Sequence, residues 1–254
     1  MGAIHSGHLS LIKESKLNCD LSVVSIFVNP AQFGPDEDYD SYPRKLQKDI
    51  SLLKNLNIDV LFLPSKETFY PENFSTYVNE ENISIRLEGR SRPHFFKGVM
   101  TVVIKLLNVV NPNCAYFGKK DIQQLRVIQK MVKDLNIDVE ILGLETVREP
   151  HGLAMSSRNN YFSNNRRSEL GAIFNALKSG EKAILTGNTD PVEIKKIVEK
   201  KLLEIKDIKI DYIDIGSFVD LKSVKTINNN IIISLAVWVD GIRLIDNIQV
   251  SSGY

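Results

Sequence analysis

The sequence has few of the residues that build disulfide frameworks and metal clusters. Only two cysteines and four histidines occur among its 254 residues. The two cysteines, Cys19 and Cys114, are too few for a disulfide-stapled fold and are typical of a protein kept in a reducing compartment. No secretory leader is recognisable, so we expect a cytoplasmic protein.

Charge and hydrophobicity exclude two further classes. Lysine and arginine total 32 against 31 acidic residues, which gives a formal net charge of +1. Such a balance provides no bulk field that would attract nucleic acid or an anionic membrane. The longest apolar stretch, 231–239, is far too short to cross a bilayer. We therefore expect small-molecule partners, with no nucleic acid and no membrane.

The first part of the chain alternates between strand and helix signals. Runs rich in apolar and β-branched residues predict strands at 21–27, 58–63, 114–117 and 139–142. Helical periodicity predicts helices between them at 45–55, 98–110 and 121–135. This order predicts an α/β fold with a Rossmann-like, doubly wound parallel sheet over residues 1–146, in which ligands bind beyond the carboxyl ends of the strands.

The pattern changes after about residue 147. A helical stripe covers 170–177, and Asp190-Pro191-Val192-Glu193 has the capping and first-turn residues of a helix start. Strand-like runs follow at 208–215, 231–239 and 242–250. Helices followed by an antiparallel meander predict a smaller α+β domain over residues 147–254.

Two histidines three residues apart form the first chemical motif. In Met1-Gly2-Ala3-Ile4-His5-Ser6-Gly7-His8, glycines surround His5 and His8 just before an apolar stripe. Backbone N–H groups and the helix dipole favour an anion at a helix start, and imidazoles add donors, so we expect phosphate contact. Two surface histidines, or a pair of metal ligands, remain the alternatives. The isolated positions of His94 and His151 disfavour the metal site.

A second polar motif leaves the first predicted strand. Pro30 breaks the strand in Phe27-Val28-Asn29-Pro30-Ala31-Gln32, so Asn29 and Gln32 can project from its carboxyl end. An amide offers both a donor and an acceptor, which suits a ligand that carries hydroxyl and carboxylate groups. Ordinary turn chemistry is the alternative.

Two more motifs carry charges suited to a nucleotide. In the first, Gly118 permits close backbone approach, Lys120 can meet phosphate and Asp121 can bind a ribose hydroxyl or simply cap a helix. In the second, Gly152-Leu153-Ala154-Met155-Ser156-Ser157-Arg158 brings two hydroxyls and a guanidinium to one loop. These groups suit a triphosphate or a departing pyrophosphate, and a solvated linker is the alternative.

Taken together, the motifs resemble the pantothenate synthetases, or pantoate–β-alanine ligases, which are related to the H-x-G-H nucleotidylyltransferases. The segments that carry the resemblance run in the family's order and span essentially the whole chain. They are MGAIHSGH, SIFVNPAQF, YPR at 42–44, LEGRSRP at 87–93, FGKKDIQQ, GLAMSSRN and RLIDN at 243–247. Each segment alone is weak, but their joint occurrence is highly specific.

The resemblance implies an ATP-dependent ligase. Members of the family activate (R)-pantoate as pantoyl adenylate with release of pyrophosphate, and the amine of β-alanine then displaces AMP. Catalysis of this kind rests on positioning and on stabilising charge at phosphate. The resemblance also implies Mg²⁺ on the phosphates and a homodimer.

Site residues carry over from the family motif by motif. Phosphate contact and catalysis are implied for His5, His8, Lys120, Ser156, Ser157 and Arg158, with His8 the proton donor. ATP binding is further implied for Met1, Gly2, Ala3, Ile4, Gly118, Lys119, Asp121, Val147 and Met155. Pantoate binding is implied for Gln32 and Gln124, and we add Asn29 from the strand-end motif and Tyr42 as a gate residue. Asp49 is implied as a metal contact.

Two departures from the family pattern stand out. In the family, a histidine usually follows Arg-Pro and a small residue; here that position is Phe95, and His94 stands one place earlier. We interpret the difference as a feature of one branch of the family and not as a sign of inactivity. Family members also carry a further N-terminal segment with the first strand of the sheet, so we expect this chain to lack that strand. The alternatives are a nucleotidylyltransferase of the same superfamily and a catalytically impaired nucleotide-binding fragment.

Overall fold

The fold comes from a computed structural model that describes residues 1–35, 37–228 and 230–251. The chain divides into two compact units. Unit 1 contains Met1–Lys119 and Gln124–Glu145, and unit 2 contains Lys120–Gln123 and the chain from Thr146 onward. The division expected from the sequence, 1–146 and 147–254, differs in the segment Lys120–Gln123, which clusters with unit 2.

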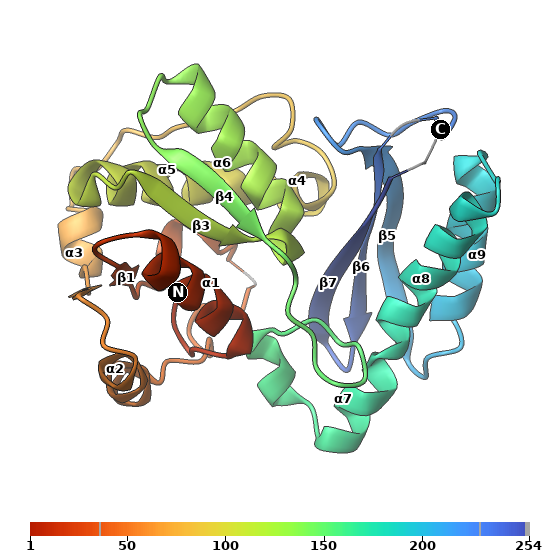
Figure 1. The fold of residues 1–254 in the computed structure, drawn as a ribbon, viewed down its shortest axis with the longest axis horizontal. Helices are drawn as coiled ribbons and strands as arrows, with labels where there is room; N and C mark the ends of the chain where they lie inside the picture. The colour runs from red at the N-terminus through yellow and green to blue at the C-terminus, as the bar shows by residue number, and fades with distance from the viewer. Residues whose placement is uncertain (36, 229, 252–254) are drawn as a thin grey trace. The chain divides into compact units, whose positions relative to one another are not determined.

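Helices and strands alternate in the first part of the chain, shown from red to green in Figure 1. The elements are α1 (Ser6–Asn18), β1 (Val23–Ser25), η1 (Pro30–Gln32), α2 (Leu46–Asn55), β2 (Val60–Phe62), α3 (Lys66–Phe69), α4 (Glu88–Ser91), α5 (Phe95–Val110), β3 (Cys114–Gly118), η2 (Lys119–Asp121), α6 (Ile122–Asp134) and β4 (Glu140–Leu144). Within the described residues, none of these or the later helices has the length and apolarity needed to cross a membrane.

The strands of unit 1 are parallel, which confirms the predicted fold class. β1 pairs with β2 and β3 pairs with β4, and the described strands of the two pairs are not hydrogen-bonded to each other. Met1 lies beside the end of β1, where its carbonyl accepts from the Phe27 N–H at 3.1 Å and its amine donates to the Ser25 carbonyl at 2.9 Å. The first residue of the chain therefore pairs with β1 in the manner of a neighbouring parallel strand.

β1 and β2 are shorter than the runs that predicted them. Leu21 is exposed, and Ile26 adds only a single hydrogen bond to the Phe62 carbonyl, at 3.0 Å. The core beside them is small: Ile12, Val24 and Leu53 are buried together. Met1, Ile4, Leu9, Ile26, Leu56, Ile58 and Leu61 pack around this cluster. The apolar residues of the loop before α1 thus anchor that loop to the core.

The two cysteines are neighbours in space. Cys19 caps the end of α1 and Cys114 begins β3, and their sulfur atoms lie 3.3 Å apart as free thiols. The Tyr116 hydroxyl lies 3.6 Å from each sulfur. Desolvation by burial raises the pKa of the Cys114 thiol, which favours the protonated form of this residue.

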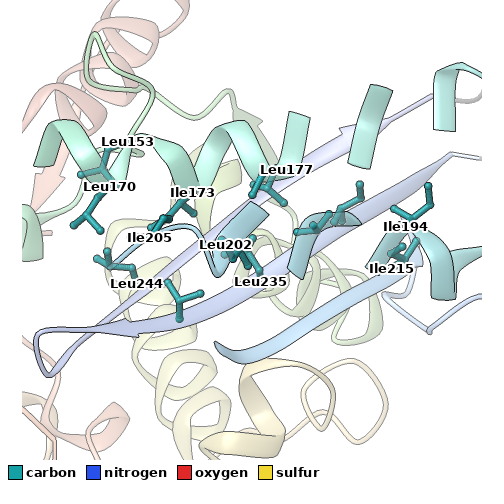
Figure 2. Packing of buried hydrophobic residues seen from close by; sticks show 14 of the residues in the cluster. Leu153, Leu170, Ile173, Leu177, Ile194, Leu202, Ile205, Ile215, Leu235 and Leu244 are labelled. Carbon is teal, nitrogen blue, oxygen red and sulfur yellow. The ribbon is translucent and has the colours of Figure 1, made fainter. Parts of the chain in front are cut away.

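Unit 2 contains η3 (Ser157–Tyr161), α7 (Asn164–Leu170), α8 (Ala172–Leu185) and α9 (Pro191–Leu202), followed by the antiparallel strands β5 (Ile208–Ser217), β6 (Ile231–Val239) and β7 (Ile242–Val250). The start of α9 is as predicted, since the Asp190 side chain accepts from the Val192 N–H at 2.8 Å. Leucines and isoleucines from α8 and α9 pack on one face of this sheet and form the core seen in Figure 2. The predicted helix-then-meander order is confirmed.

A glycine permits close contact between α5 and η1. A Cβ added to Gly98 would lie 2.0 Å from the Ala31 carbonyl oxygen and 2.7 Å from the Gln32 nitrogen. Both neighbours are backbone atoms, which cannot rotate away as a side chain could. Glycine at residue 98 is therefore a steric requirement of the turn that carries Gln32.

We predict that Gly98→Ala destabilises the protein by about 2 kcal/mol or more, through overpacking against this turn. The expected fall in Tm is roughly 5 °C for a protein of this size. Differential scanning calorimetry would measure it, with Gly118→Ala as the matched control, because a Cβ on Gly118 meets nothing within 4 Å. An equal Tm for the two variants would contradict the steric argument.

Candidate active site

The loop before α1 is fixed by a buried carboxylate. The two oxygens of Asp49 accept the N–H groups of Ala3 and Ile4, at 2.8 and 2.9 Å, and Asp49 is only 2% exposed. Ala3 has a φ of 47°, a left-handed conformation that costs an alanine about 1–2 kcal/mol. Two charge-assisted hydrogen bonds, each worth about 1.5–3 kcal/mol, outweigh that cost. Asp49 thus determines the path of the loop.

The two motif histidines cap α1 reciprocally. The Nδ1 atom of His5 accepts from the Gly7 N–H at 3.2 Å, and the Nδ1 atom of His8 accepts from the His5 N–H at 3.4 Å. The rings stack with their centroids 4.0 Å apart. Because each Nδ1 is an acceptor, a neutral ring carries its proton on Nε2, the atom that can donate to a ligand. The prediction that the motif opens a helix is confirmed.

The strand-end amides lie at η1, after β1. Asn29 is buried, with 3% exposure, and its side chain forms four hydrogen bonds. It donates to the Gly98 carbonyl at 3.0 Å and to Gln32 Oε1 at 3.2 Å. It accepts from the Ala31 N–H at 3.3 Å and from the Tyr70 hydroxyl at 2.7 Å. These four bonds use both hydrogens and both acceptor positions of the amide, so in this structure the Asn29 side chain supports Gln32.

Tyr42 and Gln124, the other residues expected at the pantoate site, both lie in unit 1. Tyr42 packs edge-on against Phe33, with ring centroids 5.6 Å apart. Gln124 lies half-buried in the first turn of α6. Phe95, in the place of the usual histidine, lies under the Arg92 guanidinium at 3.9 Å, while His94 is exposed. Phe95 thus supports Arg92, which ion-pairs with Glu37.

The FGKKD motif is split between the two units. Gly118 ends β3 opposite Leu144, and the Lys119 ammonium ion-pairs with Glu145 at the end of β4. In unit 2, the Lys120 ammonium lies 3.8 Å from Asp121, and the Lys120 carbonyl accepts from the Asn247 side chain at 2.8 Å. Each lysine of the motif thus lies beside a carboxylate, and the contact of Lys120 with Asp121 is the longer one, at 3.8 Å.

The second phosphate motif follows a short backbone pairing. The Met155 N–H donates to the Val147 carbonyl at 2.9 Å, next to the bridge between Arg148 and Ala154. Ser156 then caps η3, its hydroxyl accepting from the Arg158 N–H at 3.3 Å. Ser157 is buried, whereas Ser156 and Arg158 are half-buried. The loop is therefore an ordered helix start and not a solvated linker.

A half-buried carboxylate that sequence reasoning missed holds this loop. Glu149 accepts from Asn159 Nδ2 at 2.8 Å and contacts His151 Nε2 at 3.1 Å, and its side chain is 11% exposed. Asn159 also donates to the Ala154 carbonyl at 3.1 Å. The Arg167 guanidinium lies 3.7 Å from the same carboxylate. Glu149 thus connects residues before and after the Ser156-Ser157-Arg158 segment.

An ion pair with β7 anchors the same loop. Arg148 donates to both oxygens of Asp246, at 2.6 and 3.0 Å, and Asp246 is only 4% exposed. The guanidinium also stacks on Phe174 at 3.6 Å and donates to the Gly152 carbonyl at 3.1 Å. Because Asn247 holds Lys120, adjacent residues of β7 anchor both phosphate motifs of unit 2.

Metal ligation by protein side chains alone is not built into the described residues. No group of three or more His, Cys, Asp or Glu side chains able to hold a metal ion occurs in 1–35, 37–228 and 230–251. Asp49, expected as a metal contact, uses both of its oxygens to accept from the backbone of the loop before α1, here called the nucleotide loop (residues 1–5).

The site residues missed from the sequence act through long-range contacts. Glu149 gave no motif of its own, although a charged Arg148-Glu149 pair just before a predicted phosphate loop was the available signal. Asp246 lies within the RLIDN segment at 243–247, but the segment indicated no role for it. Tyr70 gave no sequence signal, because its partner Asn29 lies 41 residues away in the chain.

The comparisons with known proteins agree with these motifs. A family model described as pantoate-beta-alanine ligase matches residues 1–249. Pantothenate synthetases from Pseudothermotoga lettingae and Thermosipho africanus are each 51% identical over 97% of this chain and 88% of their own length.

Solved structures agree as well. Pantothenate synthetase from Thermus thermophilus is 40% identical, with a TM-score of 0.94 over 98% of this chain and 90% of that one. Pantoate-beta-alanine ligase from Francisella tularensis, complexed with beta-gamma ATP and beta-alanine, is 38% identical, with a TM-score of 0.79 over 98% of this chain and 86% of that one. The chain therefore belongs to the pantoate–β-alanine ligase family.

Proposed function

We propose that this protein condenses (R)-pantoate with β-alanine at the expense of ATP. The family match over residues 1–249 carries the proposal. A pantoate carboxylate oxygen attacks the α-phosphorus and pyrophosphate leaves, which gives pantoyl adenylate. The β-alanine amine then attacks the acyl carbon, loses a proton and displaces AMP. The two steps together form one amide bond.

The residues of the nucleotide loop and α1 act on the phosphates. The Nε2–H donors of His5 and His8 and the N-terminus of α1 stabilise negative charge on the departing pyrophosphate. Lys120, Ser156, Ser157 and Arg158 supply further donors and positive charge. Backbone and side chains of Met1, Gly2, Ala3, Ile4, Gly118, Lys119, Asp121, Val147 and Met155 complete the ATP site. The ordered capping of α1 and η3 supports this assignment, because the donors are held before the substrate arrives.

Gln32 and Gln124 hold pantoate, with β-alanine beside Gln32 and Tyr42 as a gate. Mg²⁺, which the family resemblance implies, would neutralise charge on the phosphates when bound. The proposal includes a cytoplasmic homodimer, and analytical ultracentrifugation would measure its mass.

The test of the proposal is AMP release by the purified protein with ATP, Mg²⁺, pantoate and β-alanine, each acid being omitted in turn. We expect AMP only when both acids are present. When β-alanine is omitted, pyrophosphate release should stop at one equivalent per active site. Pyrophosphate turnover without AMP would instead identify a nucleotidylyltransferase, and ATP binding without turnover would identify an impaired fragment.

Asp49→Asn should raise the KM for ATP about tenfold, because an amide can accept only one of the two loop N–H groups. The Mg²⁺ concentration for half-maximal rate should stay unchanged. Steady-state kinetics measure both. Asp59→Asn is the matched control, since Asp59 also accepts a backbone N–H, from Ser22 at 2.9 Å. A shifted Mg²⁺ midpoint with an unchanged KM for ATP would restore Asp49 as a metal contact.

Glu149→Gln should lower kcat about tenfold and raise the KM for ATP, because replacing one carboxylate oxygen by NH₂ removes an acceptor that holds the phosphate loop. The control is Glu169→Gln, which alters an exposed ion pair with Arg166. If both variants keep wild-type kcat and KM, the loop does not depend on Glu149 for its position.

A further inference from the structure

The backbone determines which way the Asn29 amide faces. Its Oδ1 atom meets the Ala31 N–H, which can only donate, and its Nδ2 atom meets the Gly98 carbonyl, which can only accept. Exchanging the two ends of the amide would bring donor against donor and acceptor against acceptor. The orientation of Asn29 therefore follows from main-chain polarity and is independent of any ligand.

Tyr70 completes the environment of the same amide. Its hydroxyl donates to Asn29 Oδ1 at 2.7 Å, so that oxygen carries two donors. Desolvation by burial raises the pKa of Tyr70 to about 12, and the phenol stays a donor through the physiological pH range. The ring is fixed by Phe27 and Phe74, with centroid distances of 6.4 and 5.0 Å.

Asn29 in turn determines the direction of the Gln32 amide. The second hydrogen on Asn29 Nδ2 is donated to the Gln32 side chain, which therefore has to present an acceptor. That acceptor is Gln32 Oε1, 3.2 Å from Asn29 Nδ2. The main chain of Gln32 is held as well, because Arg92 donates to its carbonyl at 3.2 Å. With Oε1 committed to Asn29, the half-buried Gln32 side chain has its NH₂ group left to contact a ligand.

We propose that Tyr70 and Asn29 are positioning residues that fix Gln32 as a hydrogen-bond donor toward pantoate. The proposal rests on the proposed function, in which Gln32 binds that substrate. A fixed NH₂ group selects a ligand oxygen that accepts, such as a carboxylate or a hydroxyl lone pair, and rejects a group that can only donate. The relay from Tyr70 through Asn29 to Gln32 thus contributes to substrate selection without touching substrate.

The first test uses the unmodified protein. In ¹⁵N-labelled protein, the side-chain NH₂ pair of Gln32 is assigned by its loss in Gln32→Met, and pantoate is then titrated. We expect both hydrogens of this pair to shift on saturation, because the nitrogen donates to the ligand. An unmoved Gln32 pair, in a sample where other signals report pantoate binding, would overturn the proposal.

The second test reverses the relay. Asn29→Asp places an acceptor opposite Gln32, so the Gln32 amide turns its NH₂ group inward and presents Oε1 to pantoate. The KM for pantoate should rise roughly 10- to 100-fold, while the KM for ATP stays within about twofold. Asn55→Asp, an exposed change of equal charge at the end of α2, is the control. A folded Asn29→Asp variant with the wild-type KM for pantoate would refute the relay.

Tyr70→Phe keeps the proposal testable if Asn29→Asp does not fold. It removes one donor to Asn29 and should raise the KM for pantoate about threefold to tenfold with little change in the KM for ATP. Tyr77→Phe is the control, an exposed tyrosine of the same aromatic group. An equal KM for pantoate in the two variants would remove Tyr70 from the relay. Absence of AMP release by the wild-type protein would instead refute the proposed function, a separate outcome.

Discussion

The hydrogen bonds from Asp49 to the nucleotide loop are the interaction on which unit 1 depends most. The loop carries Ala3 in a left-handed conformation and leads directly into the histidine cap of α1. Without this acceptor, the N–H groups of the buried Ala3 and the half-buried Ile4 would lose their hydrogen bonds. The same carboxylate therefore satisfies the backbone and sets the direction from which α1 presents His5 and His8.

Unit 2 uses the same kind of construction. Glu149 and Asp246 are carboxylates with little exposure; Glu149 binds residues on both sides of the Ser156-Ser157-Arg158 segment, and Asp246 binds Arg148 at the start of the same loop. A buried ion pair contributes little net stability, but breaking it leaves an unpaired charge, so the geometry around Arg148 is sharply defined. The geometry of these loops thus depends on acidic residues, although the ligand proposed for them is an anion.

Local sequence patterns were sufficient to predict the main helices and strands and to find the motifs. The apolar runs of β3 and β4, the stripe of α6 and the capping residues of α9 depend on neighbours a few positions away, and they are found where expected. The positions of Gln32 and the two histidines follow from strand ends and helix starts. Tyr70 and Glu149 could not be found in this way, since their roles depend on partners brought close only by the tertiary fold. Asn29 shows both situations. Its location at a strand end was predictable, but the hydrogen bonds of its amide depend on Gly98 and Tyr70, which the tertiary fold brings close.

The thiol pair at the far end of α1 has a practical consequence. Cys19 and Cys114 are distant in sequence, and their sulfur atoms meet only when α1 has packed against β3. Because α1 runs from the histidine cap to Cys19 over about 20 Å, a reagent on these sulfurs acts away from the histidines. A bifunctional arsenical, which needs two adjacent thiols, would therefore report assembly of the nucleotide-binding unit from within the native sequence and without an added label.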